Sequence, residues 1–277
     1  MINEEIPLIE EALRNYGEAF QEWNIEKLSI AFHPEAMTYW FIPERGGFIK
    51  GYCYGWIRMF LRNQKDNPGT NFIPFPEEID YEGTAAYVRL RFLVEDAQDP
   101  RDTTDYLTLL KFREGWNIIH KSGFTRSISL EELNTILKEK QETVRNNPEE
   151  VEKIERVLKT YADAFHELDK NKVVQVFHND MKVNSLDVEN NKFRNRFRSL
   201  ADWREVIDNH KRMNISFKTE VEKIDQLGSS AVAKMRWFAF REDGTSETVD
   251  FLTLLKVDGR WLIVNKTCYS QFKPKKD

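Results

Sequence analysis

Hydrophobic side chains recur every three or four positions between residues 6 and 23, which places them on one face of an α-helix. A shorter helix is expected at 25–32, ending before Pro34, because proline disfavours helical geometry in the preceding residue. A third helix is expected at 52–63, where apolar residues return to helical spacing. Strands are expected at 37–42, 48–49, 70–80, 84–95, 104–112 and 116–122. The pattern predicts helices followed by a long antiparallel meander.

The same pattern occurs a second time, 145 residues later (250 − 105). Asp105-Tyr-Leu-Thr-Leu-Leu-Lys111, followed by a turn and Trp116, matches Asp250-Phe-Leu-Thr-Leu-Leu-Lys256, followed by a turn and Trp261. Each copy is a pair of strands joined by a glycine-containing turn, which is a hairpin signal. Positions of the first helix recur at the same offset, among them Tyr16 as Tyr161 and Phe20 as Phe165. A period far above the roughly 20–50 residues of solenoid repeats indicates duplication of a whole domain.

These boundaries give a first domain at 1–125, a connecting helix at 126–147 and a second domain at 148–277. Ser129 and Glu132 have the spacing of a capping box, so the connection is expected to begin as a helix. Asn147 and Pro148 provide an N-cap and a first-turn proline for the next helix. The predicted fold class is α+β, with a curved antiparallel sheet wrapped around helices in each domain and a cavity between the sheet and the first helix.

Composition favours ordinary globular domains, with 40% hydrophobic and 31% charged residues. The formal net charge of −5 argues against a nucleic-acid partner, which would require a basic face. No apolar run approaches the roughly 18 residues of a membrane span, and the N-terminus lacks the features of a signal peptide. Cys53 and Cys268 occupy different places in the two repeats, which argues against a disulfide framework or a thiolate metal site. We expect a cytoplasmic protein without a membrane partner, metal or cofactor.

The Tyr- and Phe-rich first helix, the Phe32-His33-Pro34 junction and the terminal hairpin resemble the nuclear transport factor 2-like (SnoaL-like) superfamily, and within it the putative lumazine-binding family. The resemblance covers about 9–124 and again about 154–270. It implies two tandem cone-shaped domains with one pocket each. It does not supply a function, because this fold hosts isomerases, dehydratases, cyclases and modules for binding or assembly. Dimers of this superfamily commonly pair sheet to sheet, so the resemblance implies an intramolecular pseudo-dimer, and a further homodimer stays open.

The hairpin strand has two faces, because successive side chains of a strand point to opposite sides. Tyr106 and Thr108 share one face, and we assign it to the pocket. Asp105 and Leu107 share the other face, which we assign to the surface between the domains. Asp105 and Lys121 also form a charged pair at the ends of the hairpin, repeated in the second half. A structural ion pair or interface contact is favoured over a catalytic pair with a lysine of lowered pKa.

Catalysis of the ketosteroid isomerase type is not expected. By resemblance, those enzymes use a tyrosine on the first helix, a carboxylate base after the second helix and an acid on a late strand. Tyr16 matches the tyrosine. The base position falls near Trp40 and the acid position at Thr108, and neither the base nor the acid is present there or 145 residues later.

Histidines are the remaining catalytic candidates. His33 is either a general base near neutral pH or a histidine stabilised by a helix C-terminus. The second interpretation is favoured, because His178 stands at the equivalent place. His120 is a candidate polar group of the pocket or of the interface. His166 and His210 are expected at the surface.

Aromatic side chains concentrate in the first half, where they either line a pocket for a flat apolar ligand or fill the cone as core. The candidate ligand-binding residues are Tyr16, Phe20, Tyr39, Trp40, Trp56, Tyr106 and Thr108. Polar residues replace this strand region in the second half, at 184–191, so the first domain is the expected site.

The sequence therefore predicts a non-catalytic protein that binds a small hydrophobic or aromatic molecule in its first domain. One alternative is a SnoaL-like isomerase, cyclase or dehydratase acting on an aromatic or polyketide-like substrate through His33, Tyr16 or His120. Another is a structural or assembly module with filled cones.

Overall fold

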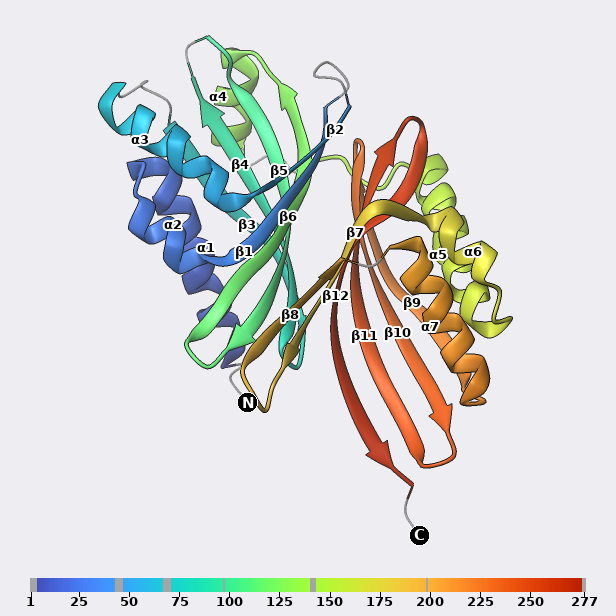
Figure 1. Cartoon of the computed structure of the whole chain (residues 1–277). Helices are drawn as coiled ribbons and strands as arrows, with labels where there is room; N and C mark the ends of the chain where they lie inside the picture. The colour runs from blue at the N-terminus through green and yellow to red at the C-terminus, as the bar shows by residue number, and fades with distance from the viewer. Residues whose placement is uncertain are drawn as a thin grey trace. The chain divides into compact units, whose positions relative to one another are not determined.

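The computed structural model describes residues 4–42, 47–66, 71–96, 98–139, 143–197 and 199–275. They form two compact units, Met1–Val144 and Arg145–Asp277, called here the first and the second unit. Each unit contains a six-stranded sheet with its first helices against one face (Figure 1). The α+β class and the duplication predicted from the sequence are confirmed.

The first unit follows the predicted order of elements. Its helices are α1 (Glu5–Glu22), α2 (Ile25–Ala31), the short 3-10 helix η2 (Cys53–Trp56), α3 (Ile57–Asp66) and α4 (Leu130–Glu139). Its strands are β1 (Phe32–Ile42), β2 (Gly47–Tyr52), β3 (Asn71–Glu82), β4 (Ala85–Glu95), β5 (Arg101–Phe112) and β6 (Gly115–Ser127). The sheet order is β2-β1-β6-β5-β4-β3, and only the β1–β6 pair is parallel. Strand β1 starts earlier than predicted, with an irregular register between Phe32 and Met37, where Pro34 has no N–H to donate.

The second unit repeats this architecture. Its helices are α5 (Pro148–His166), α6 (Lys170–Val176) and α7 (Leu200–Arg212). Its strands are β7 (Phe177–Asp187), β8 (Lys192–Phe197), β9 (Ser216–Leu227), β10 (Ser230–Arg241), β11 (Gly244–Val257) and β12 (Arg260–Pro274). The sheet order β8-β7-β12-β11-β10-β9 matches that of the first unit, with β7 parallel to β12.

The core of each unit lies between the first helix and the sheet. In the first unit, Leu13 and Tyr16 of α1 pack with Leu107 and Leu109 of β5. The faces of β5 were therefore assigned wrongly from the sequence, because Leu107 faces the helices and Tyr106 the opposite side. Both faces of β5 are buried along most of the strand, so alternation separates them without showing which one meets the helices.

Helix α4 belongs to the first unit. Its Leu133 and Ile136 pack with Leu93 of β4. Ser129 Oγ accepts a hydrogen bond from the backbone N–H of Glu132 at 3.0 Å. The carboxylate of Glu132 pairs with Arg126 at 2.7 Å, so only half of the predicted capping box forms.

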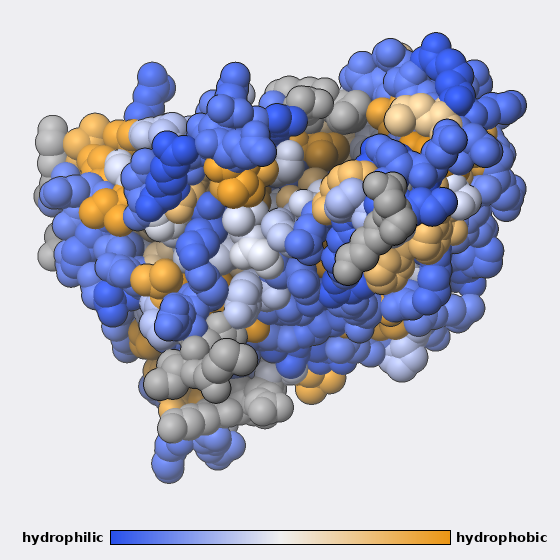
Figure 2. All heavy atoms as spheres, turned by 90° about the horizontal axis from the view of Figure 1, so that it is seen from below, coloured by the Kyte–Doolittle hydropathy of each residue, from blue (hydrophilic) through white to orange (hydrophobic). Residues whose placement is uncertain are grey.

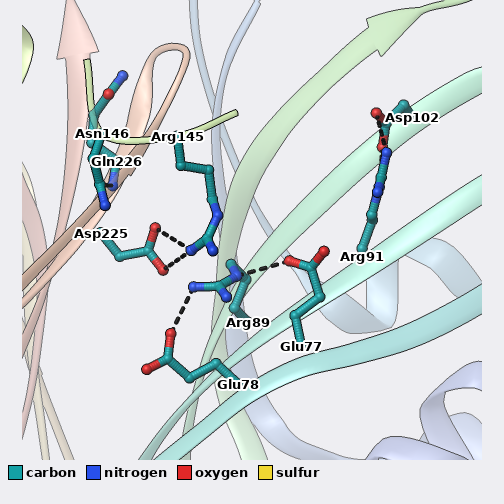
Figure 3. A network of polar contacts seen from close by, with 9 residues as sticks. All are labelled: Glu77, Glu78, Arg89, Arg91, Asp102, Arg145, Asn146, Asp225 and Gln226. Carbon is teal, nitrogen blue, oxygen red and sulfur yellow. Dashed lines mark hydrogen bonds and ion pairs between the residues drawn. The ribbon is translucent and has the colours of Figure 1, made fainter. Parts of the chain in front are cut away.

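The second unit begins with a polar anchor ahead of α5. Arg145 donates two hydrogen bonds to the carboxylate of Asp225, at 3.1 and 3.2 Å (Figure 3). The backbone N–H of Asn146 donates to the carbonyl of Gln226 at 2.9 Å. Asn147 then caps α5 through its side chain, with Pro148 as the first helical residue, as predicted. These contacts fasten the start of α5 to the end of β9.

Arginine pairs occupy the face of the first sheet that lies opposite α1 (Figure 3). Arg91 forms a two-pronged bond with Asp102, with distances of 2.8 and 2.9 Å. Arg89 contacts Glu77 at 2.8 Å and Glu78 at 2.6 Å. Arginine and aspartate satisfy each other here, since an unpaired charge at a buried position would be strongly destabilising.

The exposed hydrophobic side chains are dispersed. In the view of Figure 2, hydrophilic residues dominate and hydrophobic ones form small separate groups. Such exposure is normal for a folded domain and does not define a docking surface. Within the described ranges, no helix is long and apolar enough to cross a membrane.

Candidate functional site

Each unit has a cavity between its first helix and its sheet. The first cavity has a volume of about 160 Å³ and the second about 300 Å³. Equivalent residues at the offset of 145 line both, and the pairs include Tyr16/Tyr161, Phe20/Phe165, Phe72/Phe217, Phe92/Trp237 and Lys121/Lys266. The larger cavity is therefore in the unit that the sequence had made the weaker candidate.

A tyrosine, an aspartate and a lysine meet beside the first cavity. Tyr16 comes from α1, Asp105 from β5 and Lys121 from β6. The hydroxyl of Tyr16 donates to Asp105 Oδ2 at 2.7 Å, and Lys121 forms an ion pair with Asp105 Oδ1. Asp105 is fully buried. The predicted cross-strand ion pair is present, but it faces the helices and includes Tyr16. An acid therefore does accompany Tyr16 on a late strand, at Asp105 and not at Thr108.

The second unit contains the same three residue types at the equivalent positions. Lys266 donates to Asp250 Oδ2 at 2.6 Å and to the hydroxyl oxygen of Tyr161 at 3.1 Å. The hydroxyl of Tyr161 lies 3.5 Å from Asp250 Oδ2, at the outer limit of a hydrogen bond. Lys266 makes no other hydrogen bond to the described residues, so one of its three N–H groups is left for a ligand.

The protonation states of these groups limit their chemistry. Burial raises the pKa of Tyr16 and of Tyr161, so both phenols keep their protons at neutral pH. Burial is the largest single influence on Lys266 and disfavours its ammonium, but the attractive interactions together, with Asp250 first among them, raise the pKa of Lys266. Lys266 is therefore a cation and not an amine nucleophile or a base. The cluster can donate hydrogen bonds to an oxygen of a ligand.

Aromatic rings surround the lysine of the first unit. The Nζ atom of Lys121 lies 5.0 Å from the ring centre of Trp40, 5.6 Å from that of Tyr16 and 6.0 Å from that of Trp56. Attraction between an ammonium and aromatic faces holds the lysine in this place. In the second unit, the counterpart of Trp40 is Ser185. The large ring that covers Lys121 thus has no equivalent over Lys266.

A neighbouring position also differs between the units. Gly123 lies close to the backbone of β5, because a Cβ atom at this position would lie 2.1 Å from the Thr104 carbonyl oxygen and 3.0 Å from the Trp40 ring. The counterpart of Gly123 is Cys268, which pairs in register with Ser185. The first unit combines a large residue with glycine at this pair of positions, whereas the second combines two small side chains.

His210 of α7 is a site residue that sequence reasoning missed. It lines the second cavity and is partly buried, so the expected place on the surface was wrong. Its ring lies 5.1 Å from that of Phe217 and 5.6 Å from that of Phe165. Its position on the buried side of α7, in helical register with Trp203 and Val206, is the signal that could have found it.

The pH dependence of stability should report the position of His210. Burial, followed by the charges of Lys266 and Arg241, lowers the pKa of His210 below 6.5. The unfolded chain then binds this proton at higher pH than the folded chain, so stability falls as the pH drops through the unfolded value near 6.5. We expect His210→Gln to flatten the loss of stability between pH 7 and pH 5 in urea unfolding. His166→Gln, at an exposed position, is the control. An unchanged slope in His210→Gln would contradict the assignment.

His33 lies away from both cavities. It borders a space of only about 10 Å³, too small for an organic ligand. Its Nδ1 accepts from the backbone N–H of Glu35 at 3.1 Å, and His178 accepts from Asp180 at the same distance. The two histidines therefore make the same local contact, but with the following strand and not with the helical carbonyls that the sequence suggested.

The other predicted ligand-binding residues separate into two groups. Tyr16 and Phe20 line the first cavity, while Trp40 and Trp56 pack around Lys121. The remaining residues lie on the sheet face opposite the helices, and these are Tyr39, Tyr106, Thr108 and the catalytic candidate His120. The placement of Tyr106 and Thr108 in the pocket was wrong, for the reason given for β5.

Metal-binding side chains do not gather in the described parts of the chain, where no group of three or more His, Cys, Asp or Glu residues could hold an ion. Neither Cys53 nor Cys268 forms a disulfide bond with a described residue.

Comparison with solved structures gives similarity over about half of the chain. An NTF2-like protein of unknown function from Shewanella baltica OS155 is 25% identical, with a TM-score of 0.38 over 46% of this chain and 97% of that one. One from Methylobacillus flagellatus KT is 22% identical, with a TM-score of 0.36 over 47% and 99%. A ketosteroid isomerase-like protein from Erwinia carotovora atroseptica SCRI1043 is 14% identical, with a TM-score of 0.36 over 44% and 96%.

Comparison with curated proteins gives no match. The family model described as "Putative lumazine-binding" matches residues 4–122 and again residues 149–269. These two matches cover most of both units and reproduce the internal repeat. The chain belongs to this putative lumazine-binding family, with two copies of the family's domain in tandem.

Proposed function

We propose that the protein binds a small molecule with an aromatic part in the cavity of the second unit, where Tyr161 and Lys266 form the polar end of the site. The observation that carries the proposal is the position of Lys266, which lines a cavity of about 300 Å³ and keeps one N–H group for a ligand. That volume is at the lower end of the range of ligand sites, roughly 300–1,000 Å³.

The walls of this cavity suit a flat ring. Phe165, Trp237 and Phe217 meet edge to face, with ring centres 5.3 to 6.2 Å apart. Aromatic walls bury the faces of a planar ligand, and a few placed polar groups fix its orientation. The first unit, which the sequence had favoured, offers about half the volume and a lysine already surrounded by rings.

Binding without catalysis is the simpler assignment. The ion pair holds Lys266 protonated and burial holds Tyr161 protonated, so neither provides a base at neutral pH. Both remain good donors to a carbonyl or phenolate oxygen.

The two units offer a matched pair of variants for testing this proposal. Ser185→Trp combined with Cys268→Gly gives the second unit the tryptophan and the glycine found at these positions in the first unit. The tryptophan ring should fill the space beside Lys266. Trp40→Ser, which changes the first unit and keeps Gly123, is the control. We would screen the protein by thermal shift against flavins, lumazines, phenols and steroids, because binding to the folded state raises the melting temperature.

The expected result is a saturable rise in melting temperature for the unmodified protein and for the control variant Trp40→Ser. Ser185→Trp/Cys268→Gly should lose it, with affinity lowered at least about 100-fold, or roughly 2.7 kcal/mol. A ligand that binds this variant as well as the unmodified protein would exclude the second cavity as its site.

A further inference from the structure

The charges that line the two cavities differ. The first cavity has Arg101 and Lys121 together with the carboxylate of Asp105. The second has Lys266, Arg241 and His210, and none of the described residues that line it is an aspartate or a glutamate. The second cavity therefore presents cationic groups without a carboxylate on its surface.

Arg241 supplies the positive charge that is not balanced inside the cavity. Its Nη2 atom donates to Ser246 Oγ at 2.6 Å, and its guanidinium stacks 4.8 Å from the ring centre of Phe272. These contacts fix the group without neutralising it. The nearest carboxylate, Asp243, lies 3.7 Å from Nε and is 70% exposed, so solvent screens this pair. The buried Nε atom has no hydrogen-bond partner among the described residues.

The other two groups do not cancel this charge. Lys266 is already paired with Asp250 at 2.6 Å and contributes little net field. His210 has a buried Nδ1 atom without a hydrogen-bond partner in the described chain. Burial lowers the pKa of His210 most, and the charges of Lys266 and Arg241 lower it further, so these cations add to the positive potential at His210. Between apolar walls such a potential is screened less than in water.

The two cationic ends of the site differ in their exposure to solvent. The side chain of Lys266 is 14% exposed and that of Arg241 is 28% exposed. Lys266 with Tyr161 forms the inner end, and Arg241 with His210 the outer end. An oxygen acceptor fits the inner end, whereas a planar anion fits the outer one, because a guanidinium presents paired N–H groups that match a carboxylate.

Building on the proposed function, we infer that the ligand of the second cavity is an aromatic carboxylic acid. Its carboxylate meets Arg241 beside His210, its ring lies against Phe165, Phe217 and Trp237, and a second oxygen acceptor, where the ligand has one, meets Lys266. The inference names the class of ligand and excludes neutral and cationic aromatic molecules as preferred ligands.

A matched pair of probes tests the charge. 2-Naphthoate and 2-naphthamide share a ring system and nearly the same shape, and only the first is an anion at neutral pH. Titration calorimetry on the full chain should show that naphthoate binds at least about 10-fold tighter than naphthamide, as expected for a charge-assisted hydrogen bond of roughly 1.5–3 kcal/mol. Arg241→Gln should remove this preference and leave naphthamide binding nearly unchanged.

Two further variants make the result specific. Arg241→Lys keeps the positive charge but lacks the planar guanidinium, so it should retain part of the preference for naphthoate. Arg101→Gln changes the arginine of the first cavity and should have no effect. Circular dichroism and the melting temperature confirm that each variant is folded.

The outcomes separate the inference from the function on which it rests. Equal affinity for the two probes, or an unchanged preference in Arg241→Gln, overturns the carboxylate assignment, and the second cavity remains a binding site. If neutral aromatic molecules bind the protein and neither probe does, the carboxylate assignment is also overturned. A preference lost in Arg101→Gln places the anion in the first cavity and rejects both proposals.

Discussion

Replacing Lys266 by Met is expected to lower the free energy of unfolding by about 3–5 kcal/mol, because it leaves a buried carboxylate without its partner. Asp250 is fully buried, and Lys266 is 14% exposed beside it at 2.6 Å. Methionine keeps most of the length of the lysine side chain, so the loss reports charge more than packing. Urea unfolding at pH 7, followed by circular dichroism, measures the change.

The double variant Lys266→Met/Asp250→Asn is the control for this prediction. Removing both charges should recover much of the lost stability, because a buried ion pair contributes little beyond satisfying its own members. If the single variant were as stable as the unmodified protein, Asp250 would have to be neutral or solvated in the folded state, and the donor cluster would be wrong.

Leu107→Ala and Leu252→Ala are each expected to cost about 2–5 kcal/mol, as a large-to-small change in a close-packed core does. Both leucines are fully buried, and each belongs to the core between the helices and the sheet of its own unit. The two substitutions are equivalent across the repeat, so similar costs would show that the units are built alike. Urea unfolding gives both values.

An exposed position provides the comparison for the leucines. Ile30 is 53% exposed on α2, and Ile30→Ala should change stability by less than about 0.5 kcal/mol. A cost of similar size for Leu107→Ala would mean that Leu107 is not part of the helix-facing core.

Much of the fold was predictable because it rests on local and repeated signals. The helical spacing around Tyr16 and the hairpin that begins at Asp105 each recur 145 residues later, which fixes two copies of one domain. The cap formed by Asn147 and Pro148 uses only neighbouring residues, and it was predicted correctly. Such features need no knowledge of tertiary contacts.

The orientation of the hairpin was not predictable in the same way. A strand pattern separates Tyr106 and Thr108 from Asp105 and Leu107, but it does not say which face a helix covers when both faces are buried. The face with Asp105 was assigned to the surface between the domains, whereas Asp105 lies toward α1. Its partners, Tyr16 and Lys121, lie 89 and 16 residues away in sequence, so their shared contact depends on the packing of α1 against the sheet.

Cavity size escaped sequence reasoning for a related reason. A wealth of aromatic residues suggested a pocket in the first unit, yet the same rings fill space around Lys121. In the second unit, polar residues near Ser185 suggested the loss of a pocket, although smaller side chains leave more room. Volume depends on the sum of neighbouring side chains, and no single position reports it.

The exchange between Trp40 with Gly123 and Ser185 with Cys268 links two positions within each unit. A Cβ atom at position 123 would lie 3.0 Å from the Trp40 ring, closer than an ordinary contact, and 2.1 Å from the Thr104 carbonyl oxygen. A side chain at this position therefore requires both the ring and the neighbouring backbone to move. The residue at one of these two positions thus limits which residue the other can accept, and the two units differ by a pair of residues and not by independent single substitutions.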